Sequence, residues 1–175
     1  VLEIARSYVG AGCDMIESNS FGGNRFKLQH FGLEKRAAEL NQAAAEISRE
    51  ACGNERIVLG SVGPTGKILM MGEVSEEELL EAFGEQVMAL EKGGADAILV
   101  ETMSDLDEAR LAIRAARENT GLDIACTMTF ERTLDGDFRT MMGVSPSDMV
   151  TVLREAGADV LGSNCGNGTE GMIQV

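Results

Sequence analysis

The stretch AGADVLGSNCGNG, residues 156–168, decides the fold of this chain. It passes from a glycine through an aspartate and a short apolar run into small polar residues that include one thiol, Cys165. Gly157 suits the end of a helix, where a positive φ is needed, and the apolar run after it is typical of a buried parallel strand. The stretch therefore predicts a helix end, a strand and a polar loop, in that order.

Two earlier segments repeat this order. Residues 11–14 (AGCD) lead into the polar strand end ESNSF at 17–21, and residues 93–96 (GGAD) lead into Glu101 and Thr102. Amphipathic segments of helical period lie between the apolar runs. Strands that alternate strictly with helices predict a parallel sheet, so the polar side chains are expected to gather at the carboxyl ends of its strands.

The expected strands cover residues 15–18, 56–59, 97–101, 123–129 and 159–165, and the expected helices cover 1–10, 34–51, 75–92, 104–119 and 146–155. Three helix starts carry capping signals: Ser75 with Glu78, Ser104 with Asp107, and Ser145 before Pro146. Residues 60–66 (GSVGPTG) are expected to form a loop that lets the backbone approach a small ligand. This loop lacks the Gly-Lys-Ser/Thr ending of a phosphate loop.

Two architectures fit this pattern, an open doubly wound sheet and part of a (β/α)8 TIM barrel. Polar residues follow every predicted strand, as they do where strand ends converge on one ring. The units average about 36 residues, so eight of them need roughly 290, which is within the usual size of a barrel. The prediction is an α/β fold that forms an incomplete TIM barrel of about five βα units, with the first strand and the last two strands outside this sequence.

Composition excludes several classes of partner. The 15 basic and 29 acidic residues give a net charge of −14, which disfavours nucleic-acid backbones and anionic membranes. No apolar run approaches the ~20 residues that span a bilayer, and the N-terminus lacks the regions of a signal peptide. We therefore expect a cytoplasmic protein that binds neither nucleic acid nor membrane.

The four cysteines form no Cys-x-x-Cys pair, which argues against a disulfide framework or a zinc knuckle. Cys13, Cys52 and Cys126 lie in or beside apolar segments and are expected to be small core residues. Cys165 lies in a polar strand end, where three roles stay open: a nucleophile, a metal ligand or a buried bystander. The first needs a base, and His30 is the only histidine; the second needs further ligands.

Glu101 ends an apolar run, where a carboxylate is costly to desolvate unless it meets a cation. It is therefore a candidate for binding an amine or for acting as a general base, although a solvated loop glutamate is also possible. Neutral polar side chains at the other strand ends could bind a polar ligand or act as scaffold; these are Asn19, Ser20, Thr127, Thr129 and Asn164.

Five motifs, SNSFG (18–22), GSVGPTG (60–66), ETMSD (101–105), MTF (128–130) and GSNC (162–165), occur in an order that resembles the homocysteine S-methyltransferase domain. The nearest type is the homocysteine-binding module of cobalamin-dependent methionine synthase, and the similarity covers essentially the whole chain. The resemblance implies that residues 1–175 are part of a (β/α)8 barrel domain.

The resemblance also implies the site. Cys165 is the expected first zinc ligand, with two more cysteines in a Gly-Gly-Cys-Cys motif outside this sequence. Glu101 is expected to bind the amino group of homocysteine, and Asn19 and Asn164 to line the substrate site. Zinc would make homocysteine a thiolate for methyl transfer to methionine, with no other catalytic residue.

The expected methyl donor is methylcobalamin on a cobalamin-binding domain or protein, although betaine and S-methylmethionine remain open as donors. The fragment alone is expected to be inactive, because one thiolate is a weak zinc site. The alternatives are another barrel methyltransferase, a pterin-binding barrel and a non-catalytic barrel module.

Overall fold

The structure is a computed structural model that describes residues 1–175. Its main strands are β1 (Met15–Glu17), β2 (Ile57–Val62), β3 (Ala97–Met103), β4 (Asp123–Met128) and β7 (Val160–Ser163). The α-helices are α1 (Leu2–Gly10), α2 (Arg25–Gln29), α3 (Ala37–Cys52), α4 (Glu76–Lys92), α5 (Leu106–Asn119), α6 (Pro146–Glu155) and α7 (Gly168–Gln174). Two 3-10 turns, η1 (Glu34–Arg36) and η2 (Leu69–Met71), and a hairpin of β5 (Glu131–Arg132) and β6 (Phe138–Arg139) complete the chain.

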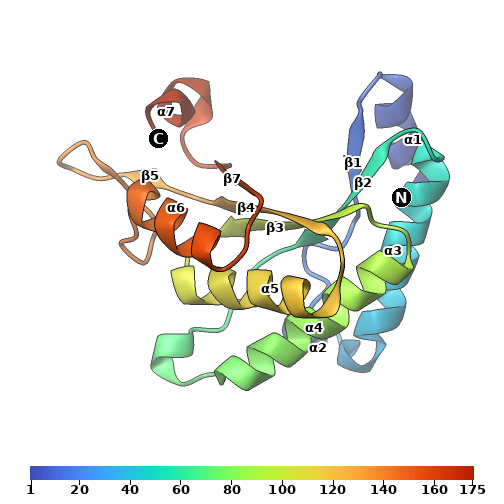
Figure 1. Cartoon of the computed structure of the whole chain (residues 1–175), viewed down its shortest axis with the longest axis horizontal. Coiled ribbons are helices and arrows are strands. Elements are labelled where there is room, and N and C mark those ends of the chain that lie inside the picture. The colour runs from blue at the N-terminus through green and yellow to red at the C-terminus, as the bar shows by residue number, and fades with distance from the viewer.

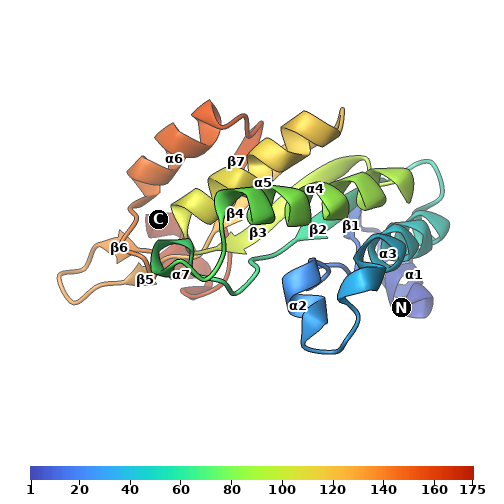
Figure 2. The same cartoon turned by 90° about the horizontal axis from the view of Figure 1, so that it is seen from below.

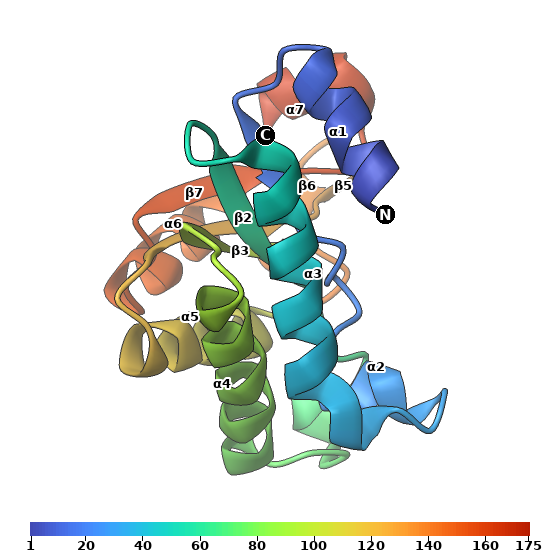
Figure 3. The ribbon, with the colours of Figure 1, turned by 90° about the vertical axis from the view of Figure 1, so that its right-hand side faces the viewer.

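One parallel sheet organises the molecule, with the strand order β1-β2-β3-β4-β7 (Figure 1). Helices α1, α3, α4, α5 and α6 pack side by side in that order. Figure 2 shows α4 and α5 lying along the sheet, and Figure 3 shows α1 beside α3. The predicted α/β fold with alternating strands and helices is confirmed.

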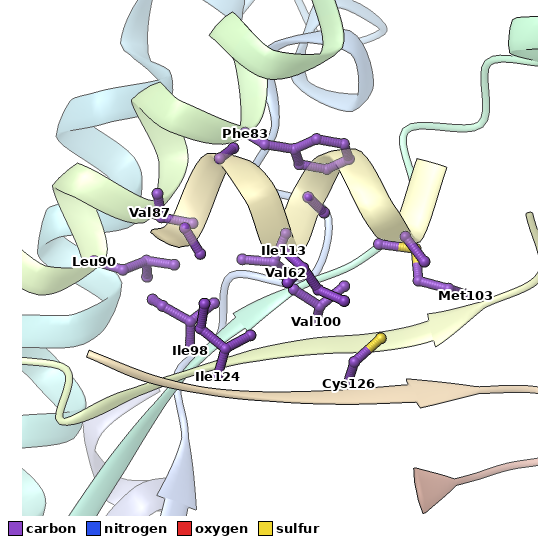
Figure 4. Close-up of a cluster of buried hydrophobic side chains, with 14 of the residues drawn as sticks. Val62, Phe83, Val87, Leu90, Ile98, Val100, Met103, Ile113, Ile124 and Cys126 are labelled. Atoms are coloured by element: carbon purple, nitrogen blue, oxygen red, sulfur yellow. The ribbon is translucent and has the colours of Figure 1, made fainter. Parts of the chain in front are cut away.

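The core lies between this helix layer and the sheet face that it covers. Alternate residues of the three central strands point into it and are fully buried: Val58, Val62, Ile98, Val100, Ile124, Cys126 and Met128. They meet Phe83, Val87 and Leu90 from α4 and Ile113 from α5 (Figure 4). Burying each large apolar side chain stabilises the fold by about 1.5–3 kcal/mol, so this layer is the main source of stability.

The opposite face of the sheet is not covered by helices in the same way. Met15, Ile57 and Val160 point to it and are 52%, 39% and 61% exposed. Strands β1 and β7 each pair on one side only, because they are the two edges of the sheet. The molecule therefore has one packed sheet face, one open sheet face and two free edges.

The glycine-aspartate segments behave as predicted. Gly12, Gly94 and Gly157 have φ values of 95°, 97° and 107°, which only glycine adopts readily. The aspartates after the last two glycines join neighbouring strands. Asp96 accepts a hydrogen bond from a backbone N–H of β2 at 2.7 Å, and Asp159 accepts one from β4 at 2.8 Å. Each carboxylate also pairs with an arginine near the end of a helix, Arg49 or Arg117.

The capping predictions are confirmed at two of three helices. Ser75 and Ser145 form capping boxes at the starts of α4 and α6. The spacing of Ser104 to Asp107 predicts Ser104 as the cap of α5, and this prediction is wrong. The cap is Asp105, whose carboxylate accepts hydrogen bonds from two backbone N–H groups. The cap lies one residue later because β3 continues to Met103.

Two boundaries differ from prediction for reasons beyond local sequence. Strand β2 runs to Val62, so Gly60 and Ser61 lie within the sheet and not in a loop. They pair with β3, which supplies the hydrogen bonds that make them a strand. A turn near Gly136 closes the short β5–β6 hairpin, which the sequence analysis did not predict. None of the helices combines the length and the apolar composition that spanning a bilayer requires.

Candidate functional site

A cavity of about 700 Å³ lies at the edge of the sheet near the carboxyl ends of β1, β2 and β3. Its polar lining includes Glu17, Asn19, Ser61 and Glu101. Its apolar lining comes mainly from α1 and β1: Val1, Ile4, Ala5, Tyr8, Met15 and Ile16. The cavity therefore combines a carboxylate-bearing wall with an apolar wall.

The two carboxylates of this cavity interact. Glu17 is exposed as a residue, but partial desolvation of its carboxyl and, secondarily, the nearby charge of Glu101 raise its pKa. The Ser61 hydroxyl donates a hydrogen bond to Glu101 and orients that carboxylate. Two close negative charges favour a cation between them, because a cation removes their mutual repulsion. The arrangement is suited to an ammonium group.

A buried polar network supports the loop that follows β1. The hydroxyls of Ser18 and Ser20 lie 2.6 Å apart, and Ser20 donates to the carbonyl of Ser61 at 2.7 Å. Gln86 of α4, fully buried, donates to the carbonyl of Ser20 at 2.9 Å. These bonds fix the loop on both sides of Asn19, whose exposed side chain lines the cavity.

A second network joins the carboxyl ends of β3, β4 and β7. The hydroxyl of Thr127 donates to Asn164 Oδ1 at 2.8 Å. Asn164 Nδ2 donates to Thr102 Oγ1 at 2.8 Å and contacts Cys165 Sγ at 3.3 Å. Because the amide nitrogen has two hydrogens, these two contacts use both of them. The exposed thiol of Cys165 is thus contacted by Asn164, whose amide is itself held by Thr102 and Thr127.

The remaining cysteines do not share this setting. Cys52 and Cys126 are buried, and burial raises the pKa of both thiols, that of Cys126 to about 12. The expectation that they are core residues is confirmed, while Cys13 is half-buried beside the cavity. His30 is exposed at the end of α2 and is not among the hydrogen-bond partners of Cys165.

Residues 1–175 do not complete a metal site by themselves. No group of three or more histidine, cysteine, aspartate or glutamate side chains lies close enough to hold an ion. Cys165 supplies one sulfur, whereas structural and catalytic zinc sites use three or four protein ligands. The predicted zinc site therefore requires ligands from outside these residues.

The sequence matches the family model for homocysteine S-methyltransferase over residues 1–175. The chain belongs to the homocysteine S-methyltransferase family. It is 32% identical over 186 residues to methionine synthase from Mycobacterium tuberculosis (strain ATCC 25618 / H37Rv), and 30% identical over 184 residues to methionine synthase from Mycobacterium leprae (strain TN). Each match covers 99% of this chain and 15% of the relative.

Solved structures show the same fold. The metallated form of the homocysteine methyltransferase MmuM from Escherichia coli superposes with a TM-score of 0.78 at 23% identity. The match covers 94% of this chain and 62% of that one. The oxidised form gives a TM-score of 0.75. At this identity the likeness describes the fold, and this chain spans less than two thirds of that protein.

The four predicted site residues fall into two groups in the structure. Glu101 and Asn19 line the cavity, and Asn164 and Cys165 belong to the network at the end of β7. The groups meet at β3, where Glu101 and Thr102 are consecutive. Their roles in substrate and metal binding stay predictions.

Sequence reasoning missed Glu17 as a site residue and gave Thr102 no role of its own. Glu17 carried a usable signal, since it is a carboxylate one residue before the end of a predicted strand, close to the position that Glu101 has in its own strand. For Thr102 no comparable signal exists, because its setting depends on the pairing of β3 with β4.

Proposed function

We propose that residues 1–175 are part of a (β/α)8 homocysteine-binding domain of the methionine synthase type, which holds homocysteine for methyl transfer to give methionine. One observation carries the proposal. The carboxylate pair suited to an ammonium group and the exposed thiol of Cys165 lie at the ends of parallel strands and are joined through consecutive residues of β3. The open face of the sheet, with its free edges, supports a barrel that further strands would close.

In this proposal Glu101 binds the amino group of homocysteine. Ser61 holds the carboxylate in place, and the negative charge of Glu17 adds to the attraction for the ammonium. Asn19 and Asn164 line the substrate site. Anchoring the amino-acid end restricts the position of the sulfur, which contributes to the rate by orientation.

Zinc belongs to the proposal only for the complete domain. Cys165 would be one of three thiolate ligands, and the other two would come from outside residues 1–175. Because one sulfur does not hold the ion, we derive no step through zinc, and we expect residues 1–175 alone to be inactive. The metallated form of the E. coli relative supports a metal in this family of sites.

The proposed methyl donor is methylcobalamin, presented by a cobalamin-binding domain or protein. The support is the likeness to two proteins named methionine synthase. This chain spans about 15% of their length, so the activity of a whole protein remains part of the proposal.

The test uses the full-length protein that carries this chain. Zinc content and homocysteine binding by calorimetry are measured for the wild type, Cys165→Ser, Glu101→Gln and the control Cys52→Ala, which alters a buried thiol away from the strand ends. We expect stoichiometric zinc in the wild type and control, and its loss in Cys165→Ser. Glu101→Gln should keep zinc and weaken homocysteine binding at least about tenfold, because a charged partner is lost. Absence of zinc from the wild type would contradict the proposal.

A further inference from the structure

Strand β3 contains one extra residue at its carboxyl end. Val100 pairs with Cys126 and Met103 pairs with Met128, so three steps along β3 correspond to two along β4. Such a bulge breaks the alternation of side chains between the two faces of a sheet. Here Val100 and Met103 both point into the helix-side core, where both are fully buried (Figure 4).

The bulge therefore leaves two consecutive side chains, Glu101 and Thr102, outside the helix-side core. Glu101 accepts a hydrogen bond from Ser61 of β2. Thr102 accepts one from Asn164, which follows β7 on the opposite side of β3 in the sheet. In a regular strand these two neighbours would point to opposite faces.

The backbone of Thr102 is in the left-handed region, with φ at 60°. A β-branched residue is rare there, and the conformation persists only where its surroundings hold it. Thr102 N–H donates to Thr127 Oγ1 at 3.2 Å, so that hydroxyl is free to donate its own hydrogen to Asn164 Oδ1. The loop of hydrogen bonds thus fixes both the strained backbone and the orientation of the Asn164 amide, which contacts Cys165.

We propose that Thr102 is a positioning residue that sets the spacing between Glu101 and the thiol of Cys165. The inference rests on the proposed function, in which homocysteine must satisfy both ends of the site at once. Three carbons join the amino group of homocysteine to its sulfur and limit how far apart the two can lie, so a shift of one end of the site relative to the other weakens its binding. A ligand without an amino group does not use Glu101 and does not sense that shift.

The test compares homocysteine with 4-mercaptobutanoate, which is homocysteine without its amino group. Binding to the full-length protein is measured by calorimetry for the wild type, Thr102→Val and Thr102→Ser. Thr102→Val keeps the branched shape and removes the acceptor for Asn164. We expect it to weaken homocysteine binding about tenfold, as loss of one hydrogen bond of ~1.4 kcal/mol would, and to leave 4-mercaptobutanoate unchanged. Thr102→Ser should restore homocysteine binding.

Two further variants separate positioning from folding. Thr127→Val removes the partner of Thr102 without altering the strained residue, and it should give the same selective loss. Thr151→Val, on the exposed side of α6, is the matched control and should change neither ligand. Provided that the wild type binds and methylates homocysteine, two results would overturn the inference. One is that the variants lose affinity for both ligands equally. The other is that neither Thr102→Val nor Thr127→Val loses affinity for homocysteine. A wild type that does not methylate homocysteine would refute the proposed function itself, and the inference with it.

Discussion

Removing the Arg49 side chain is expected to lower the free energy of unfolding by about 3 kcal/mol. The guanidinium donates to the carbonyls of Gly53 at 2.8 Å, Arg56 at 3.0 Å and Gly94 at 2.9 and 3.1 Å, and it pairs with Asp96. A hydrogen bond to a charged group that is shielded from water contributes about 1.5–3 kcal/mol to the free energy of unfolding. Arg49 is 23% exposed, so water replaces part of each bond, and the total stays well below their sum.

Arg117 makes a smaller version of the same set of contacts, and this allows an internal comparison. It donates to the carbonyls of Gly157 at 2.8 Å and Leu122 at 3.1 Å, and it pairs with Asp159. It reaches one carbonyl fewer and is 34% exposed, so Arg117→Ala should cost about 2 kcal/mol. Arg114→Ala is the control, because Arg114 is 48% exposed and has only a surface pair with Glu118, worth less than about 0.5 kcal/mol.

The assay is urea unfolding of the complete domain that contains this chain, followed by far-ultraviolet circular dichroism. The expected order of destabilisation is Arg49→Ala, then Arg117→Ala, then Arg114→Ala. The reasoning would be refuted if Arg49→Ala matched the Arg114→Ala control, since water would then replace the carbonyl contacts without loss. It would also be refuted if Arg117→Ala were the more damaging change.

Two further predictions concern a buried acid and a helix end. Glu108 is buried and accepts hydrogen bonds from the backbone and hydroxyl of Thr65, and burial raises its pKa above 4.5. The native state then holds the proton of the Glu108 carboxyl more tightly than the unfolded state does, so the stability of the fold falls as the pH rises from 4.5 through the raised pKa. Over this pH range the melting temperature of Glu108→Gln should fall less than that of the wild type. Gly93→Ala should cost about 2 kcal/mol in urea unfolding, because its Cβ would lie 2.4 Å from the carbonyl of Gln42, whereas Gly10→Ala meets no atom within 4 Å and should not destabilise.

Much of the fold follows from signals that act within a few residues. The glycines before β1, β3 and β7 adopt positive φ because a helix ends there, and Ser75 and Ser145 cap helices because their side chains reach a backbone N–H three residues on. The spacing of apolar residues, which is also a signal within a short stretch of sequence, separates helices from strands. Such local signals placed all five main strands.

The site depends on contacts between distant parts of the chain, and these have no local signature. Ser61 meets Glu101 across 40 residues, and Asn164 meets Thr102 across 62. The motifs named Glu101 and Asn164 as candidates, but only the sheet register shows which partner each one has. The bulge at Thr102 is equally invisible in sequence, because one extra residue in a strand changes neither composition nor period by a detectable amount.

The positions of backbone strain argue that the Asn164 network serves the site and not stability alone. The chain has two non-glycine residues with positive φ, Thr102 at 60° and Cys165 at 63°. Each such residue costs on the order of 1–3 kcal/mol, which a glycine at the same position would avoid. Asn164 Nδ2 contacts the side chains of both, and it would lose both partners if glycines replaced them. The backbone strain is therefore retained at the strand ends, where the side chains of Thr102 and Cys165 must be held in place. Such a loss of stability is expected at a site whose function depends on its geometry.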